Sequence, residues 1–250
     1  MHDFGEFCYL DLQKTGSSFV SDFLRRHVRL PELHFRKHKP YRPRKLGGGD
    51  RGLMFISVRD PLDQYLSLYF HGVGGKGGLR NRLGRTLPDH ASGLYSGSPA
   101  AFEDWVRFVL APENAMYIGA DYEKAPARII GLQTFRFVRL AVRRPDRNLA
   151  RIGRREDLNL VYETASLPFV VLRTESLNCD LAQLCRGRLA PFLIEPELAV
   201  RELLEGGTPV NASDRPDREQ RLAISDDVRR LVQDREWFLL ERFGYGPYHC

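Results

Sequence analysis

Five consecutive residues near the start of the chain have the chemistry to bind a phosphate or sulfate group. They are Lys14-Thr15-Gly16-Ser17-Ser18. Lysine supplies a mobile cation, glycine lets the backbone approach a ligand closely, and three hydroxyl groups can donate hydrogen bonds. In a Walker A loop the lysine follows the glycines, whereas here it precedes the glycine, so an ordinary ATPase or GTPase is disfavoured. A solvated turn with a serine N-cap is the alternative interpretation of these five residues alone.

A second candidate for anion binding is the pair Arg59 and Ser67. Residues 53–58 form a nearly continuous apolar run, which is typical of a strand covered on both faces in a parallel sheet. Arg59 follows this run directly. Asp60 and Pro61 suit the N-cap and the first position of a helix that would carry Ser67 about two turns in. Because ligands of open α/β sheets bind beyond the carboxyl ends of strands, the pair could hold a second phosphate.

Both candidate groups need a strand and a helix to position them. Residues 7–12 have the pattern of a buried strand, and the apolar spacing over 19–28 predicts one face of a helix. This arrangement brings backbone N–H groups and the positive helix end to one point. A third apolar strand is predicted over 167–172, with a helix near 177–186. The alternation predicts one α/β domain over 1–250, with a central parallel sheet flanked by helices.

The two groups, in this order, resemble the sulfotransferases that use 3′-phosphoadenosine 5′-phosphosulfate (PAPS). The resemblance implies a P-loop-like sulfotransferase fold, with PAPS as the donor and 3′-phosphoadenosine 5′-phosphate (PAP) as the product. Lys14 would contact the bridging oxygen and the sulfuryl group in transfer. Residues 16–18 would cradle the 5′-phosphate, with Thr15 beside it. Arg59 and Ser67 would hold the 3′-phosphate.

Later segments also resemble the family. Residues 170–177 are similar to a strand followed by the Arg-x-Glu-x-Leu turn of many members, and 241–245 is similar to bacterial and carbohydrate-type members. The chain lacks the Arg-Lys-Gly loop of the enzymes that act on phenols and hormones. Residues 210–215 resemble an Asn-x-Ser segment of carbohydrate-type members. Arg215 is therefore a candidate donor contact, and an exposed loop arginine is the alternative.

The transfer also needs a base for the acceptor hydroxyl, and His38 is the candidate. It lies in Arg36-Lys37-His38 after the first predicted helix, where several family branches carry Lys-Thr-His or a glutamate-containing equivalent. A neutral imidazole, with an ordinary pKa of about 6.5, can accept a proton at neutral pH. A surface histidine in a basic segment is the alternative interpretation. Glu175 is a rival base, and His34, His71 and His90 remain open.

Charge and composition limit the partners. The formal net charge is +6, from 38 basic and 32 acidic residues. This is modest for a nucleic-acid binder, and without an RNA motif or a recognition helix no nucleic-acid partner is expected. The arginines clustered over 136–155 indicate a solvated face, or contacts with an anionic donor or acceptor. The four cysteines lack metal-ligand spacing, so reduced thiols and no metal are expected.

No run approaches the roughly 18 apolar residues that a membrane span requires, and residues 1–6 lack the features of a signal peptide. We therefore expect no membrane span and a cytoplasmic enzyme.

The expected acceptor bears a hydroxyl group. The carbohydrate-type features and the arginine cluster favour a sugar, while a peptide tyrosine, a lipid-linked alcohol or a small molecule remains open.

Two other functional classes compete with sulfotransferase activity. One is a nucleotide-dependent phosphotransferase, which the missing Walker A loop and the lack of a clear acidic magnesium ligand disfavour. The other is a nucleotide-binding protein without catalytic activity.

Overall fold

The computed structural model describes residues 1–41, 52–206, 224–246 and 248. Its internal contacts divide the chain into two compact units, which we describe separately. Unit 1 comprises Met1–Arg59, Arg139–Pro145 and Thr164–Ala212, and unit 2 comprises Asp60–Val138, Asp146–Glu163 and Ser213–Cys250. The fold class is mixed α/β. One domain over residues 1–250 stays a prediction.

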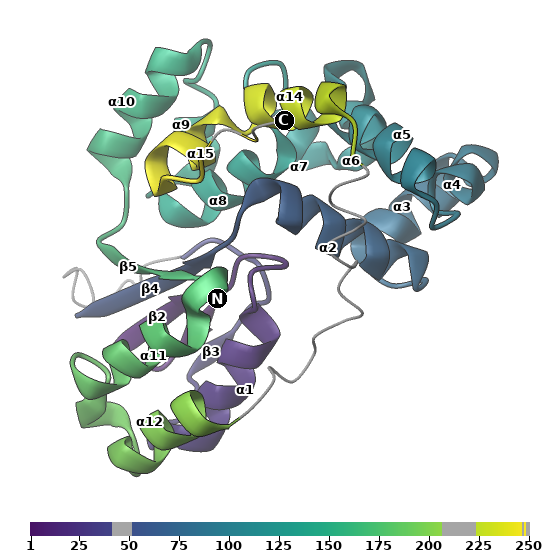
Figure 1. Ribbon diagram of the computed structural model, residues 1–250. Helices are drawn as coiled ribbons and strands as arrows, with labels where there is room; N and C mark the ends of the chain where they lie inside the picture. The colour runs from purple at the N-terminus through teal and green to yellow at the C-terminus, as the bar shows by residue number, and fades with distance from the viewer. Residues whose placement is uncertain (42–51, 207–223, 247, 249–250) are drawn as a thin grey trace. The chain divides into compact units, whose positions relative to one another are not determined.

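Unit 1 contains an open five-stranded sheet with the order β3-β1-β2-β4-β5 (Figure 1). Its strands are β1 (His2–Asp3), β2 (Phe7–Leu10), β3 (His34–Phe35), β4 (Leu53–Val58) and β5 (Phe169–Arg173). The predicted parallel arrangement is confirmed for β2, β4 and β5. It is wrong for β1, which pairs antiparallel with β2 and β3. The connection from β1 to β2 is too short for the crossover that a parallel pair needs.

The apolar runs bury both faces of β2 and β4. Phe7, Tyr9 and Phe55 point to one face, and Cys8 and Met54 point to the other, since successive side chains alternate along a strand. All five are fully buried. The strand predicted over 53–58 coincides with β4, whereas the one predicted over 7–12 ends at Leu10.

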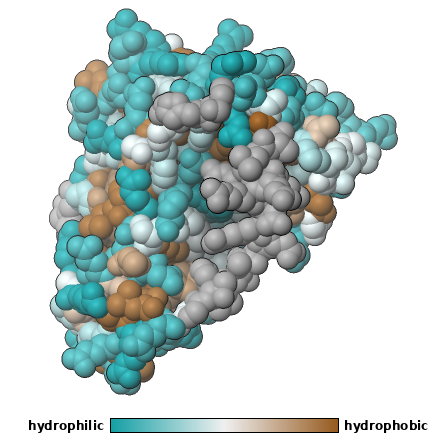
Figure 2. Space-filling model, in the orientation of Figure 1, coloured by the Kyte–Doolittle hydropathy of each residue, from teal (hydrophilic) through white to brown (hydrophobic). Residues whose placement is uncertain are grey.

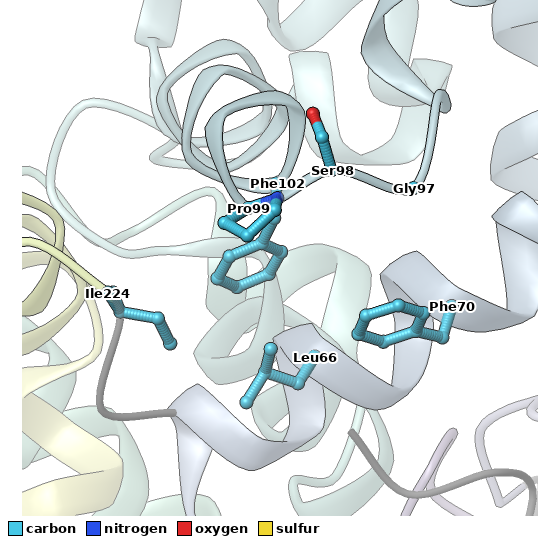
Figure 3. A pocket seen from close by; sticks show the side chains of 7 residues that line it. All are labelled: Leu66, Phe70, Gly97, Ser98, Pro99, Phe102 and Ile224. Carbon is cyan, nitrogen blue, oxygen red and sulfur yellow. The ribbon is translucent and has the colours of Figure 1, made fainter. Parts of the chain in front are cut away.

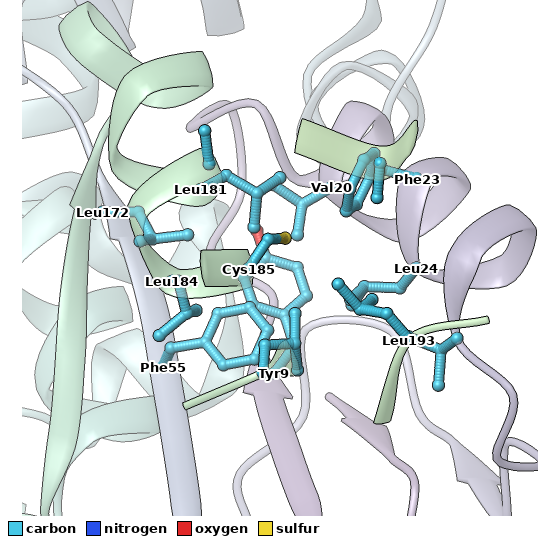
Figure 4. Close-up of a cluster of buried hydrophobic side chains, with 14 of the residues drawn as sticks. Tyr9, Val20, Phe23, Leu24, Phe55, Leu172, Leu181, Leu184, Cys185 and Leu193 are labelled. Atoms are coloured by element: carbon cyan, nitrogen blue, oxygen red, sulfur yellow. The ribbon is translucent and has the colours of Figure 1, made fainter. Parts of the chain in front are cut away.

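Helices α1 (Ser17–His27), α11 (Leu177–Arg186) and α12 (Pro196–Glu205) pack on the face that carries Tyr9 and Phe55 (Figure 4). Two short 3-10 helices, η2 (Thr174–Ser176) and η3 (Ala190–Phe192), flank α11. The helices contribute a set of fully or nearly fully buried apolar side chains: Val20, Phe23, Leu24, Leu181, Leu184 and Cys185. Burying each large apolar side chain stabilises the fold by about 1.5–3 kcal/mol. This packing fixes where α1 begins relative to the end of β2.

In the described part of unit 2, every regular element is a helix. Its elements are α2 (Pro61–Val73), α3 (Gly78–Thr86), α4 (Pro88–Leu94), α5 (Pro99–Leu110), η1 (Pro112–Asn114), α6 (Ala115–Ile118), α7 (Ala120–Glu123), most of α8 (Leu132–Ala141), α9 (Pro145–Leu149) and α10 (Arg155–Ala165), α14 (Asp226–Arg235) and α15 (Trp237–Phe243). The predicted start of α2 is confirmed: the Asp60 carboxylate caps it by accepting the Asp63 N–H, and Pro61 is its first residue.

Two stretches of unit 2 differ from what their local sequence predicts. The many glycines of 71–78 predict a loop, but α2 continues to Val73 and α3 begins at Gly78. Gly72 lies within α2, where the ring of Tyr95 fills the space that a Cβ would need. The apolar spacing after Asp226 predicts one helix that ends at Gly244, and the observed helix has these limits but is broken at Glu236 into α14 and α15.

Glu236, the residue at this break, also contacts the start of α8. Its fully buried carboxylate accepts the backbone N–H groups of Gln133 (3.0 Å) and Thr134 (2.8 Å), so it caps the start of α8. The hydroxyl groups of Thr134 and Tyr65 also donate to it. Burial raises the pKa of Glu236, and these hydrogen bonds oppose that rise. A group with so many partners is better explained as a structural anchor than as a catalytic acid.

Candidate functional site

The candidate site lies where three parallel strands of unit 1 end. Because β2, β4 and β5 are parallel, the loop after β2, Arg59 after β4 and η2 after β5 all follow the same edge of the sheet. Hydrogen bonds join these segments. The Arg59 guanidinium donates to the Lys14 carbonyl oxygen over 3.4 Å, and the Thr174 hydroxyl donates to the Val58 carbonyl oxygen over 2.9 Å.

A chain of buried hydroxyl groups supports the loop from beneath. Thr15 Oγ1 donates to the Leu12 carbonyl oxygen (2.9 Å) and lies 2.7 Å from Ser57 Oγ, which lies 2.7 Å from the Tyr9 hydroxyl. Since Thr15 gives its only hydroxyl proton to a carbonyl, Ser57 must donate to Thr15 and Tyr9 to Ser57. The Thr15 side chain therefore anchors the loop to the sheet and is not free to donate to a ligand.

Gly16 is required for two physical reasons. Its φ of 77° is in the left-handed region, where a side chain is strained. In addition, a Cβ at Gly16 would come 2.6 Å from Leu177 Cδ2. The first residue of α11 thus fills the space on the Cβ side of Gly16, and a close approach of a ligand to its backbone stays a prediction. Leu177 is the final residue of the Arg-x-Glu-x-Leu pattern.

Lys14 is a cation without a counter-ion among the described residues. It is half-buried, has a φ of 64°, and no carboxylate in the described ranges lies within ion-pair distance of it. Burial lowers the pKa of Lys14, and the charges of Arg59 and Lys37 lower it further. A bound anion would relieve all three effects at once.

The start of α1 adds a second favourable place for negative charge. No acidic residue lies in its first turn and no side chain caps it. The first N–H groups of a helix have no partners within the helix and carry the positive end of its dipole. Ser17 is buried and Ser18 is exposed, and within the described part of the chain neither hydroxyl group has a hydrogen-bond partner. These groups fit an anion better than a solvated turn that a serine caps.

His38 lies at the same end of β2, as its candidate role requires. Its Nδ1 is 2.7 Å from the Asp11 carbonyl oxygen, and its backbone N–H is 3.0 Å from each carboxylate oxygen of Asp11. A carbonyl can only accept, so Nδ1 carries the proton and Nε2 holds a lone pair. Burial lowers the pKa of His38, while the contacts with Asp11 oppose this shift. The ring is therefore a neutral base at neutral pH.

Arg59 and Ser67 belong to different units of the chain. Arg59 is half-buried and ends unit 1, next to the Lys14 loop. Ser67 is half-buried on α2 in unit 2. The shared role of the two residues at a 3′-phosphate stays a prediction.

The rival bases are divided between the two units. Glu175 is exposed within η2, His34 is exposed in β3, and His90 is exposed on α4 in unit 2. His71 is half-buried near the end of α2, where its ring packs against Gly77. Of the four, Glu175 follows the same edge of the sheet as the end of β2, at which His38 lies.

Three arginines of the cluster over 136–155 contact other residues of unit 2. Arg136 is half-buried. Burial of its guanidinium lowers the pKa of Arg136 to about 10, and the nearby Glu236 and tyrosines oppose this shift. Arg155 pairs with Asp234 and lies over the ring of Trp237, and Arg154 pairs with Asp157. These contacts favour a structural role for those arginines. Arg215 lies outside the described residues.

Unit 2 contains a small apolar pocket. It is lined by Leu66, Phe70, Gly97, Ser98, Pro99, Phe102 and Ile224 (Figure 3). None of these side chains carries a charge, and the Ser98 hydroxyl is engaged in capping α5. The pocket therefore offers nothing to hold an anion or move a proton.

Apolar side chains also reach the surface of unit 1. Ile194, Leu198 and Leu204 are 58%, 43% and 49% exposed, and Figure 2 shows brown side chains over α11 and α12. They lack the chemistry of the candidate site. In the described part of the chain, no helix has the length and apolar character to cross a membrane.

Sequence reasoning missed several residues that shape the site. The sequence pattern predicted no role for Asp11, and it placed Ser57 within an apolar run without a separate role. Asp180 was not considered, although its carboxylate accepts the Arg173 N–H (2.7 Å) and the Ser176 hydroxyl (3.0 Å). A lone serine in an otherwise apolar strand was the available signal for Ser57, because a buried hydroxyl needs a partner.

Comparisons of the chain with protein-family models, with curated proteins and with solved structures found no match.

Proposed function

We propose that the protein is a sulfotransferase that moves the sulfuryl group of PAPS to an acceptor hydroxyl, with a carbohydrate as the favoured acceptor. The observation that carries the proposal is Lys14, a half-buried cation with no counter-ion among the described residues, beside the uncapped start of α1. The order of Lys14, Arg59 and Ser67 in the sequence resembles that of PAPS-dependent enzymes, and this supports a nucleotide phosphosulfate as the anion.

PAPS would supply the sulfuryl group, with its 5′-phosphate as the leaving group. Lys14 and the first N–H groups of α1 would bind that phosphate and stabilise the negative charge that develops on it. His38 Nε2 would accept the proton of the acceptor hydroxyl as the new O–S bond forms and the S–O bond to the phosphate breaks. Most of the rate enhancement would then come from positioning and electrostatics.

The test is turnover of sulfur-labelled PAPS with panels of sugars, tyrosine peptides and small alcohols, with and without a metal chelator. We expect transfer to at least one acceptor class, and turnover that the chelator leaves unchanged. ATP-dependent, chelator-sensitive transfer would instead support a phosphotransferase. Binding of PAP without transfer to any acceptor would support a nucleotide-binding protein.

The variant Lys14→Ala sharpens this test. The φ of 64° at position 14 strains alanine and lysine alike. The substitution therefore removes the charge and leaves the backbone strain energy nearly unchanged. Turnover should fall more than donor affinity, because the cation interacts more strongly with the leaving phosphate than with bound PAPS. Lys124→Ala, which removes an exposed lysine of unit 2, is the control. Wild-type turnover in Lys14→Ala would show that Lys14 is not catalytic.

A further inference from the structure

The strongest unassigned feature of the site is the set of contacts between Asp11 and His38. Asp11 directly follows β2 and is 2% exposed. Both of its carboxylate oxygens lie 3.0 Å from the His38 N–H, and its carbonyl oxygen lies 2.7 Å from His38 Nδ1. One residue therefore holds both the backbone and the ring of the candidate base.

The backbone of His38 needs such an anchor. Its φ of 54° lies in the left-handed region, which only a few per cent of residues other than glycine adopt, although histidine adopts it more often than most. A residue in this conformation persists only when its surroundings compensate for the strain. A charged acceptor for the N–H group is a strong form of compensation, since hydrogen bonds to ionised groups are stronger than neutral ones.

The ring is held by a different part of Asp11. Because the Asp11 carbonyl oxygen accepts from Nδ1–H, the proton of the neutral ring is kept off Nε2. Nε2 is then the only ring atom that can accept a proton. The nearest carboxylate oxygen of Asp11 lies 3.4 Å from Nδ1, so its charge also stabilises the protonated ring.

We infer that Asp11 is a positioning residue for His38, whose carboxylate fixes the backbone of His38 and whose carbonyl fixes the ring with Nε2 as the free base. This inference rests on the proposed function for its catalytic consequence. The contacts themselves do not depend on it. The other charged groups that act on His38 are Lys37 and the Met1 amine, which also contacts the Asp11 carboxylate.

Two substitutions separate the charge of Asp11 from its role as an anchor. Asp11→Asn keeps an acceptor oxygen for the His38 N–H but removes the charge, so the pKa of His38 should fall below its wild-type value. Asp11→Ala removes the anchor, so the ring should become exposed and its pKa should rise towards the ordinary value of about 6.5. Asp22→Asn, an exposed carboxylate of α1, is the matched control.

The experiment is nitrogen NMR of the histidine rings in the full-length protein across a pH titration, with His38→Asn to assign the signal among the seven histidines. We expect the proton on Nδ1 in the wild-type protein, opposite pKa shifts in the two Asp11 variants, and no shift in Asp22→Asn. A proton on Nε2 in the wild type, or one unchanged pKa in all variants, would overturn the inference. Thermal unfolding identifies a variant that does not fold, and Asp11→Asn then decides alone.

Turnover provides the second readout. Asp11→Ala should lower kcat about tenfold to a hundredfold, as expected for a misplaced base, while PAP affinity stays nearly unchanged. Wild-type kcat with an unmoved acidic limb in both Asp11 variants would contradict the positioning role. If the wild-type protein transfers sulfuryl groups to no acceptor, the proposed function fails, whereas the NMR comparison still decides whether Asp11 controls the ring of His38.

Discussion

Leu177 occupies the space into which a side chain at Gly16 would project. A Cβ on Gly16 would lie 2.6 Å from Leu177 Cδ2, well inside van der Waals contact. The relationship couples the loop after β2 to the start of α11. The position of the candidate anion-binding loop is therefore set by packing between elements that are far apart in the sequence.

Gly16→Ala should destabilise the protein by about 2–5 kcal/mol, because left-handed strain and overpacking against Leu177 add together. Thermal or denaturant unfolding measures this change. Gly75→Ala is the control: its φ of 72° is similar, but nothing lies within 4 Å of its Cβ position. Its cost should be limited to about 1–2 kcal/mol of strain. Equal costs at the two positions would contradict the role of Leu177.

Binding of PAP should weaken as the pH rises through the pKa of Lys14. In the free protein this pKa is lowered below its ordinary value of 10.5. A bound phosphate favours the charged form and raises the pKa again, so between the two values binding takes up a proton. Calorimetry in buffers of different ionisation enthalpy measures this uptake.

The control for this prediction is Lys14→Arg, because arginine stays charged throughout the accessible range. It should bind PAP with little dependence on pH in the alkaline range. If the wild-type dependence on pH persists in Lys14→Arg, another group takes up the proton.

PAP should bind more tightly than AMP by roughly tenfold to a hundredfold, since a charge-assisted hydrogen bond to the 3′-phosphate contributes about 1.5–3 kcal/mol. Ser67→Ala should reduce this preference. Ser92→Ala, which removes an exposed hydroxyl group on α4, should not. Equal calorimetric affinity for the two nucleotides would defeat the assignment of Arg59 and Ser67.

His38→Asn should remove most turnover and leave nucleotide binding nearly intact, because a general base contributes about 10²–10⁴-fold. Asparagine tolerates the left-handed backbone of this position, so the fold should be preserved. His38→Gln should likewise lose turnover, since neither amide can accept the proton.

The wild-type pH profile adds a sharper criterion. A base acts only when neutral, and the pKa of His38 is lowered, so activity should persist as the pH falls until it passes below about 6.5. This acidic limb should be absent in His38→Asn and unchanged in His34→Asn, which replaces an exposed histidine of β3. A limb that survives in His38→Asn would make His38 a bystander, and Glu175 would be tested next.

The sequence alone determined the elements whose signals are local. The apolar run 53–58 became β4, Asp60 and Pro61 opened α2, and the periodic pattern at 177–186 became α11. These signals work because a helix start or a buried strand depends on residues within a few positions of one another. The order of strands and helices likewise indicated a sheet with parallel central strands.

Only the tertiary structure decided how the candidate site is built. Asp11 and His38 are 27 positions apart, and Thr15 and Ser57 are 42 apart, so no local pattern encodes their contacts. Whether Thr15 points towards a ligand or into the core, and whether Lys14 has a counter-ion, depends on which segments return to the end of β2. The orientation of Thr15 and the surroundings of Lys14 depend on packing and on hydrogen bonds to buried polar groups across the whole unit.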